Sequence, residues 1–465
     1  MSTADTCFDV IVIGSGPAGQ KAAVQSAKKG KRVAIIEQDR FLGGACVHRG
    51  TIPSKTLREN ALRVKKMREN ASLCSFELGE DTEVAALLDR LGAVIDAHDG
   101  FLVRQVERNG IVRLHGRAHL RDPKTLGLEG LSGEEVIYSA ESFVIATGSV
   151  PRHPKGLPID HENIFDSDSI LTMTYLPPSL TVLGGGVIAS EYASIFQALG
   201  VKVTMIDRYE RPLGFMDGDL VERFLATFQE MGGTWLGNKT VEHVEWDGVA
   251  EVVACCDDGT EYRNAKLLVA AGRVANVQGL GLDHLGIELN AQGNIPVDEH
   301  LCTEVPGVFA AGDVIGPPAL ASASMEQGRR AACNALGVEI GKTAKLIPAG
   351  IYAIPELSGV GLTEQQAKEQ GGAIVGTAGF DEISRGQISG AKDGLLKIIC
   401  DADGDKILGV QIVGEGATEL VHIGQMAMLS GSSVDIFVES IFNFPTFAEA
   451  YRVAALSVIG QRNKK

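Results

Sequence analysis

One pattern occurs twice in this chain and constrains its fold more than any other feature. A short apolar run leads into a glycine-rich turn, a helical stretch follows, and a second apolar run ends in an acidic residue. Gly14 and Glu37 in the first copy are 23 positions apart, as are Gly184 and Asp207 in the second. This order is typical of a strand–turn–helix–strand unit that binds a dinucleotide. The sequence therefore predicts an internal duplication and two bound dinucleotides.

The turn glycines have separate physical roles in such a unit. Gly14 permits a tight turn, Gly16 lets a pyrophosphate approach the backbone, and Gly19 allows the helix to pack closely on the strand. The helix N-terminus stabilises the phosphates, and Glu37 accepts hydrogen bonds from a ribose. A glycine-rich turn that binds no ligand is the alternative. The second copy offers Gly184, Gly186 and Asp207 for the same roles.

Composition excludes several classes of partner. The chain has 465 residues, with 43 Lys and Arg against 59 Asp and Glu, for a net charge of −16. Phosphate is repelled over most of such a surface, so we expect no nucleic-acid partner and no anionic membrane. No apolar run approaches the roughly 18 residues of a membrane span, and no basic segment opens a signal peptide, so we expect a cytoplasmic protein.

The eight cysteines also limit the possibilities. They include no C-x-x-C pair, and no Cys/His cluster has the spacing of zinc ligands. We therefore expect reduced thiols, no disulfide scaffold and no metal site. The adjacent Cys255 and Cys256 suggest redox sensing, but their strand-like setting favours a structural origin.

A third motif sets the predicted domain order. Val308 to Val314 reads as a strand that ends in an exposed acid, Asp313, at a glycine turn. It lies beyond the second unit, yet the first unit needs a partner for the far end of an extended cofactor. The simplest chain path that satisfies both conditions has the second unit inserted within the first. We predict an α/β fold with a first Rossmann-like domain at 1–150 and 277–345, a second at 151–276, and a C-terminal α+β domain at 346–465. In the last domain, residues 395–399 and 407–413 read as strands and residues 419–429 as a helix.

Several motifs together resemble one protein family. They are the turn at 14–19, Gly43-Gly44-Ala45-Cys46, Ile52-Pro53-Ser54-Lys55, Ala146-Thr147-Gly148, Gly272-Arg273 and Ala311-Gly312-Asp313. They resemble the two-dinucleotide-binding flavoproteins related to glutathione reductase and dihydrolipoamide dehydrogenase. The resemblance implies FAD on the first unit, NAD(P) on the second, and a C-terminal domain that makes at least a homodimer.

The resemblance also implies roles for single residues. Glu37 would bind the adenosine ribose and Asp313 the ribityl chain, while Lys55 would lie beside the flavin N5, paired with Glu191. A lysine there stabilises the negative charge of reduced flavin, and a carboxylate holds it in place. The alternative is an exposed lysine and a glutamate on a helix surface. Further cofactor contacts implied by the motifs are Gly43, Gly44, Cys46, Gly116, Ala118 (with Gly116 at the adenine), Thr147, Gly148, Gly272, Arg273 and Gly312.

Two departures from the family decide the predicted chemistry. Its disulfide members carry two cysteines five positions apart, whereas here Cys46 is followed by Thr51. A threonine hydroxyl can hydrogen-bond to the flavin but cannot form a disulfide, which leaves Cys46 as a packed thiol. Those members also carry a His-Pro near the C-terminus, where this chain has Phe444, which cannot carry a proton. Both losses together indicate that the dithiol half-reaction has been abandoned.

Within the family, residues 50–55 and 442–456 are similar to the soluble pyridine nucleotide transhydrogenases. The resemblance implies that hydride passes between NADPH and NAD⁺ through the flavin N5, with one site for both coenzymes. Asp207 favours the free 2′-hydroxyl of NAD, while Arg208 and Arg211 could pair with the 2′-phosphate of NADP, or be solvated surface arginines. The alternatives are an NAD(P)H diaphorase or oxidase that reduces quinone or oxygen, and a catalytically silent flavin-binding protein.

Overall fold

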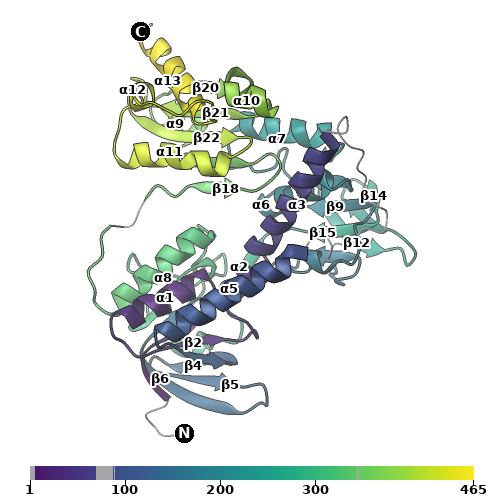
Figure 1. Ribbon diagram of the computed structural model, residues 1–465. Helices are drawn as coiled ribbons and strands as arrows, with labels where there is room; N and C mark the ends of the chain where they lie inside the picture. Colours follow the sequence, from purple (N-terminus) through teal and green to yellow (C-terminus); the bar gives the residue numbers. More distant parts are fainter. Residues whose placement is uncertain (1–5, 70–86, 88, 343–344, 465) are drawn as a thin grey trace.

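The computed structural model describes residues 6–69, 87, 89–342 and 345–464. Figure 1 shows three domains stacked along the long axis of the molecule, with the two termini at opposite ends. Among the described residues, no helix is long and apolar enough to cross a membrane.

The first domain is built on a seven-stranded sheet. Six of its strands follow the order β3-β2-β1-β6-β5-β4, and the seventh, β17, lies off this path and pairs with β6. Strand side chains alternate between the two faces. Val10 and Val12 therefore pack under helices α1 and α8, whereas Ile11 and Ile13 pack on the opposite face with the β4–β5 hairpin. The elements are β1 (Cys7–Ile13), α1 (Pro17–Lys28), β2 (Val33–Glu37), β3 (Val112–His115), β4 (Arg117–Asp122), β5 (Thr125–Glu129), β6 (Glu135–Ile145), β17 (Val308–Ala310) and α8 (Ala321–Ala335).

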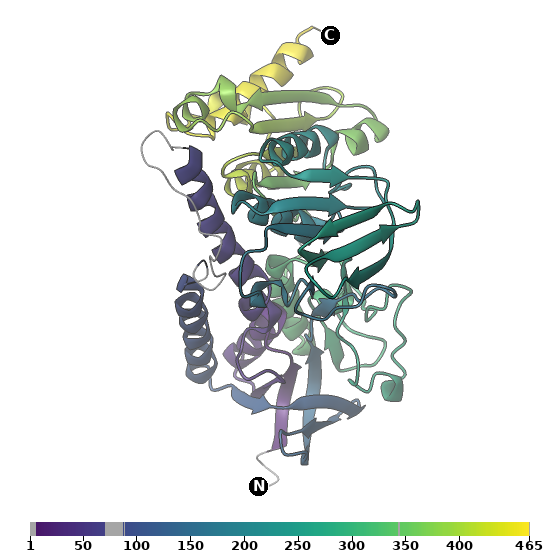
Figure 2. The ribbon, with the colours of Figure 1, turned by 90° about the vertical axis from the view of Figure 1, so that its right-hand side faces the viewer.

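In the described part of the chain, three helices lie between β2 and β3 in the sequence. They are α2 (Gly44–His48), α3 (Thr51–Glu69) and α5 (Asp89–Arg108). Helix α3 leaves the first domain and packs against α6 of the second (Figure 1). Figure 2 shows the three domains from the side. The side chains at the start of α3 are therefore held between two domains. Cys74 lies outside the described residues.

The chain enters and leaves the second domain through one pair of antiparallel strands, β7 (Ser149–Pro151) and β16 (Arg273–Ala275). It then returns to the first sheet, where β17 lies parallel to β6. The expected strand from Val308 to Val314 is shorter than predicted, because it stops at Ala310 and a 3-10 turn occupies Asp313–Ile315. Gly312, with a φ of 83°, makes that turn possible, and Asp313 is half-buried rather than exposed.

The second domain repeats the parallel arrangement, with the sheet order β11-β10-β9-β15-β8. A small antiparallel sheet, β12-β13-β14, packs beside it, and Cys255 and Cys256 lie in β13. The elements are β8 (Ile164–Asp166), β9 (Ser179–Leu183), α6 (Val187–Ala198), β10 (Lys202–Ile206), α7 (Gly218–Glu230), β11 (Thr234–Leu236), β12 (Val241–Trp246), β13 (Val252–Cys256), β14 (Glu261–Asn264) and β15 (Lys266–Val269).

The C-terminal domain is an antiparallel sheet, β18-β19-β22-β21-β20, covered by helices α11 and α13. The strands predicted at 395–399 and 407–413 are β21 and β22, and the helix predicted at 419–429 begins two residues earlier. The elements are β18 (Ala349–Ile351), β19 (Leu357–Gly361), α9 (Glu364–Glu369), β20 (Ile374–Gly379), α10 (Ser384–Ser389), β21 (Leu395–Cys400), β22 (Ile407–Val413), α11 (Ala417–Leu429), α12 (Ile436–Glu439) and α13 (Glu449–Arg462).

Candidate functional site

All three domains contribute to one cavity of about 650 Å³. Its walls are the turn before α1, the tip of β2, the starts of α2 and α3, the crossing of β7 and β16, one face of α6, the start of α8 and the beginnings of β18 and α11. Pockets at the carboxyl ends of parallel strands are the usual nucleotide sites of such sheets.

The turn before α1 forms a phosphate cradle at one end of the cavity. Gly14 has a φ of 102°, and a Cβ there would overlap the carbonyl oxygen of Ala146 at the end of β6. Gly16 is the N-cap of α1 and makes no side-chain cap hydrogen bond. A Cβ on Gly16 would meet no described atom within 4 Å. Uncapped N–H groups at an open helix N-terminus attract anions, so this end fits the pyrophosphate of FAD.

Glu37 supports that cradle from the tip of β2. Its Oε2 accepts hydrogen bonds from the backbone N–H (3.1 Å) and the hydroxyl (2.6 Å) of Ser15. Its Oε1 accepts one from the backbone N–H of Asp39 (3.0 Å). The backbone N–H of Gly43 in turn donates to the Ser15 hydroxyl (3.0 Å). Glu37 therefore holds the glycine turn in shape and still borders the cavity, where a ribose has been predicted.

Lys55 and Glu191 form an ion pair inside the cavity, with 2.7 Å between Nζ and Oε2. The two residues come from different domains, at the start of α3 and on α6. The Glu191 side chain is 7% exposed, so the alternative of a glutamate on a helix surface does not describe it. The buried Glu191 carboxylate binds the Lys55 ammonium, and the pair brings a positive charge to the cavity wall.

Cys46 and Thr51 lie on the same wall, beside that pair. Burial raises the pKa of the Cys46 thiol, although the Thr51 hydroxyl that hydrogen-bonds to it and the charge of Lys55 both lower it. The thiol is therefore neutral near pH 7 and is a poor nucleophile. Thr51 presents a hydroxyl beside the Cys46 thiol, and the residues that line the cavity include no second cysteine.

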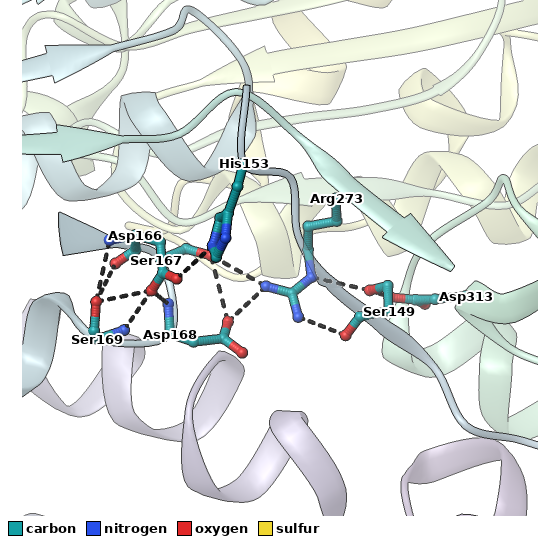
Figure 3. A network of polar contacts seen from close by, with 8 residues as sticks. All are labelled: Ser149, His153, Asp166, Ser167, Asp168, Ser169, Arg273 and Asp313. Carbon is teal, nitrogen blue, oxygen red and sulfur yellow. Dashed lines mark hydrogen bonds and ion pairs between the residues drawn. The ribbon is translucent and has the colours of Figure 1, made fainter. Parts of the chain in front are cut away.

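Arg273 connects the second domain to the first, as Figure 3 shows. Its Nη1 binds Asp168 (2.6 Å) and the Ser167 hydroxyl (3.1 Å), and its Nε donates to the Ser149 hydroxyl (2.9 Å). The Ser149 hydroxyl donates to Asp313 Oδ2 (2.8 Å). Arg273 thus connects Asp168, in the predicted NAD(P)-binding domain, to Ser149. The Ser149 hydroxyl in turn binds Asp313, the residue predicted to hold the ribityl chain.

The neighbouring turn at 166–169 is itself tightly bonded. Burial alone would raise the pKa of Asp166, but hydrogen bonds from Ser169, His153 and backbone N–H groups lower it. His153 Nε2 lies 3.0 Å from Asp166 Oδ2. These hydrogen bonds stabilise the ionised Asp166 carboxylate and hold the turn in place. The same turn carries Ser167 and Asp168, which bind Arg273.

The second glycine turn repeats the geometry of the first. Gly184 has a φ of 122° and lies against Ala270 at the end of β15, and Gly186 is the N-cap of α6, again without a side-chain cap hydrogen bond. Asp207 follows β10 and accepts a hydrogen bond from the backbone N–H of Tyr209 (3.1 Å). Its Oδ2 would lie 2.9 Å from a Cβ on Gly185, so it faces the turn.

The two arginines after Asp207 differ in position. Arg208 is exposed, and its guanidinium lies over the Tyr209 ring, 4.8 Å from the ring centroid. Arg211 lies against Gly218 in a separate hollow that Asp217 and Lys397 also line. No described contact brings Arg211 to Asp207.

The cavity collects most, but not all, of the residues singled out in the sequence. Those that line it are Gly14, Gly16, Glu37, Gly44, Cys46, Thr51, Lys55, Gly116, Ala118, Thr147, Gly148, Glu191, Arg273, Gly312 and Asp313. Those outside its wall are Gly19, Gly43, Gly184, Gly186, Asp207, Arg208, Arg211 and Gly272. Sequence reasoning missed the wall supplied by the C-terminal domain, which includes Gly350, Tyr352, Thr418 and His422. None of these four residues belongs to a local motif that could have signalled it.

Two nucleotide-binding domains that share one cavity with a Lys–Glu pair define a class of flavin- and pyridine-nucleotide-dependent oxidoreductases. The chain belongs to the pyridine nucleotide-disulphide oxidoreductase family: the family model matches residues 8–328, and the model of the family's dimerisation domain matches residues 347–455. The predicted family and fold class are confirmed, as are FAD and NAD(P) as cofactors. The dimerisation domain supports a homodimer.

The chain is also similar over nearly its whole length to individual curated proteins. The chain is 42% identical over 457 residues to the soluble pyridine nucleotide transhydrogenase of Mycobacterium tuberculosis (strain H37Ra), covering 98% of this chain and 97% of the relative. It is 39% identical over 457 residues to the protein of that name from Photobacterium profundum, covering 97% of each.

Solved structures show the same architecture. LpdA from Mycobacterium tuberculosis superposes with a TM-score of 0.89 at 26% identity, covering 96% of this chain and 99% of LpdA. The HOCl-induced flavoprotein disulfide reductase RclA from Escherichia coli superposes with a TM-score of 0.86 at 27% identity, covering 97% and 99%.

Proposed function

We propose that this protein is an FAD-dependent transhydrogenase of the Si-specific type (EC 1.6.1.1), which moves hydride between NADPH and NAD⁺ without a redox disulfide. The observation that carries the proposal is the wall where Thr51 lies against Cys46 beside the Lys55–Glu191 pair. The Lys–Glu pair that the proposal needs beside the flavin is present at this wall, and the position five residues after Cys46 carries a hydroxyl in place of a thiol. The names of the relatives support the same activity.

Each residue contributes a distinct function in this proposal. When bound, FAD supplies a two-electron carrier between two nicotinamide nucleotides. The N-terminus of α1 and Gly16 hold its pyrophosphate, and Glu37 its adenosine ribose. Asp313, which is oriented by Ser149, holds the ribityl chain.

The charged pair and the departures from the family define the chemistry at the flavin. Lys55 presents a positive charge, and the Thr51 hydroxyl offers a hydrogen bond at the same wall. Phe444 is 70% exposed in the protomer and offers no group that can exchange a proton. Hydride transfer between nucleotides needs neither a thiolate nor such a group.

An anaerobic titration of the purified holoenzyme, followed by flavin absorbance, tests the proposal. NADPH bleaches the flavin, and NAD⁺ added alone then restores the oxidised spectrum while NADH appears. Bleaching that quinone or oxygen reverses, but NAD⁺ does not, would identify a diaphorase or oxidase instead. A protein that neither NADPH nor NADH bleaches would be a silent flavin-binding protein.

Coenzyme recognition is proposed to rest on Asp207 and Arg208. Asp207 faces the second glycine turn and suits the NAD ribose, while the exposed Arg208 guanidinium, which contacts Tyr209, has further N–H groups for a 2′-phosphate. We expect Arg208→Ala to raise KM for NADPH about tenfold or more, as loss of one charge-assisted hydrogen bond would, and to leave KM for NADH unchanged. Arg211→Ala is the matched control, because Arg211 lies in the other hollow. The reverse result would assign the 2′-phosphate to Arg211.

A cytoplasmic location is part of the same proposal. It is supported by the word soluble in the relatives' names and by the acidic composition. Cell fractionation with immunodetection tests it, and recovery of the protein in the membrane or periplasmic fraction would contradict it.

A further inference from the structure

Tyr352 contacts both members of the Lys55–Glu191 pair, although it belongs to the C-terminal domain. Its backbone N–H donates to Glu191 Oε1 (2.9 Å), while the Lys55 ammonium binds Glu191 Oε2 (2.7 Å). Its ring faces the same ammonium, with 4.9 Å between Lys55 Nζ and the ring centroid. One residue therefore bonds the anion through its backbone and the cation through its side chain.

The segment that carries Tyr352 is anchored to both helices of the pair. From α3, Arg58 Nε donates to the Ala353 carbonyl oxygen (3.2 Å) and Arg58 Nη2 binds Glu356 (2.8 Å). From α6, the Ser194 hydroxyl accepts a hydrogen bond from the backbone N–H of Ile354 (3.0 Å). Residues 352–356 thus cannot move without breaking bonds to the helices that bear Lys55 and Glu191.

The side chain of Thr418 on α11 lies beside the Tyr352 hydroxyl. Thr418 is itself held by Glu356 Oε2, which accepts hydrogen bonds from its backbone N–H (3.1 Å) and its hydroxyl (2.8 Å). The anchored backbone of residues 352–356 places the ring, and the face of the ring meets the Lys55 ammonium.

Lys55 needs such a surface. Its side chain is 27% exposed to the cavity and carries a long, flexible stem, so one ion pair leaves it several orientations. An aromatic face attracts an ammonium electrostatically and restricts where it lies. The Glu191 carboxylate, bonded on its other oxygen by the Tyr352 N–H, cannot rotate to follow a moving lysine.

We propose that Tyr352 is a positioning residue that holds the Lys55 ammonium at one place in the flavin cavity and thereby sets the charge that bound FAD meets. This inference rests on the proposed placement of FAD beside Lys55. It does not depend on which acceptor reoxidises the flavin, so a diaphorase would show the same effect.

The midpoint potential of bound FAD, measured by equilibration with a reference dye, tests this role without any turnover. In Tyr352→Leu the Lys55 ammonium loses the aromatic face and keeps only its ion pair with Glu191, so its position is less restricted and the reduced, more negative flavin loses stabilisation. We expect a tenfold change in the two-electron equilibrium, which is about 30 mV toward lower potential. Tyr352→Phe keeps the ring and the backbone N–H, and is expected to retain the wild-type potential.

A double-mutant cycle separates positioning from a general structural effect. In a Lys55→Met background, Tyr352→Leu is expected to cause no further shift, because the charge it positions is gone. A shift of equal size in both backgrounds, or an unchanged potential in Tyr352→Leu, would overturn the proposal.

Fluorinated phenylalanines at position 352 keep the test decisive even if the leucine variant does not fold. They preserve the shape of the ring and weaken its attraction for cations step by step. We expect the potential to fall with each added fluorine, and a flat series would refute the role of the ring.

Discussion

Lys397 occupies the junction between the second domain and the C-terminal domain, and its replacement by methionine measures how strongly that junction is held. Its ammonium lies 2.7 Å from Asp219 and 3.5 Å from Asp217, at the start of α7, and 2.6 Å from Glu364, at the start of α9. Burial alone would lower the pKa of Lys397, but hydrogen bonds to Asp219 and Glu364 raise it. The lysine is therefore charged at neutral pH.

The magnitude follows from a comparison of two lysines that bind the same carboxylate. Lys397 is 4% exposed, whereas Lys368 is 60% exposed and lies 2.5 Å from Glu364 within α9. Removal of one partner from a buried pair costs about 3–5 kcal/mol when the remaining charge stays buried, as the Asp217 carboxylate does at 5% exposure. An exposed pair four residues apart on a helix contributes about 0.3–0.5 kcal/mol. Lys397→Met should therefore destabilise the protein about ten times as much as the control, Lys368→Met.

Urea unfolding followed by tryptophan fluorescence is a suitable assay. Both tryptophans of the chain, Trp235 and Trp246, lie in the second domain, whose helix α7 carries two of the carboxylates. With an m-value of about 3 kcal/mol/M, the midpoint should fall by about 1–1.7 M urea for Lys397→Met and by about 0.1–0.2 M for Lys368→Met. Equal shifts for the two variants, or a Lys397→Met protein as stable as wild type, would refute the reasoning.

Three further predictions concern the cradle, the thiol and the C-terminal helix. Gly16→Ala should leave the Tm of the apoprotein unchanged, because the added methyl meets no described atom within 4 Å, but should weaken FAD binding about tenfold or more in a fluorescence titration; unaltered affinity would exclude Gly16 from the cradle. Since burial raises the pKa of Cys46, iodoacetamide should modify it about tenfold more slowly at pH 7.5 than the exposed Cys7, as mass spectrometry can measure; equal rates would show a thiolate at Cys46. Hydrogen bonds from Arg462 lower the pKa of Asp435 to about 2, so its contribution to stability is present above the unfolded value near 4 and is lost as the pH falls toward 2. Asp435→Asn should therefore have a lower Tm than wild type at pH 6 and the same Tm near pH 2, and a gap independent of pH would contradict the assignment.

Much of the fold could be predicted from local patterns. The two glycine turns, their following helices and the acids at the strand tips recur at one spacing, because a tight turn and a close helix–strand contact impose glycine at particular positions. The chemical consequence of Thr51 in place of a cysteine was equally clear from the sequence, since a hydroxyl cannot exchange electrons as a thiol does. The sequence did not reveal that the strand that begins at Val308 ends at Ala310, because Gly312 turns the chain earlier than the apolar run suggests.

The sequence by itself determined which chemical groups are available; tertiary structure decided which of them meet. Lys55 and Glu191 are 136 positions apart, and Glu191 and Tyr352 are 161 apart, so no local period could reveal that the three residues share one contact. Arg211 follows Asp207 closely in the chain, yet it lines a hollow to which Asp207 does not contribute. These outcomes depend on how three domains pack, because contacts between side chains distant in sequence form only when the buried faces of separate domains come together.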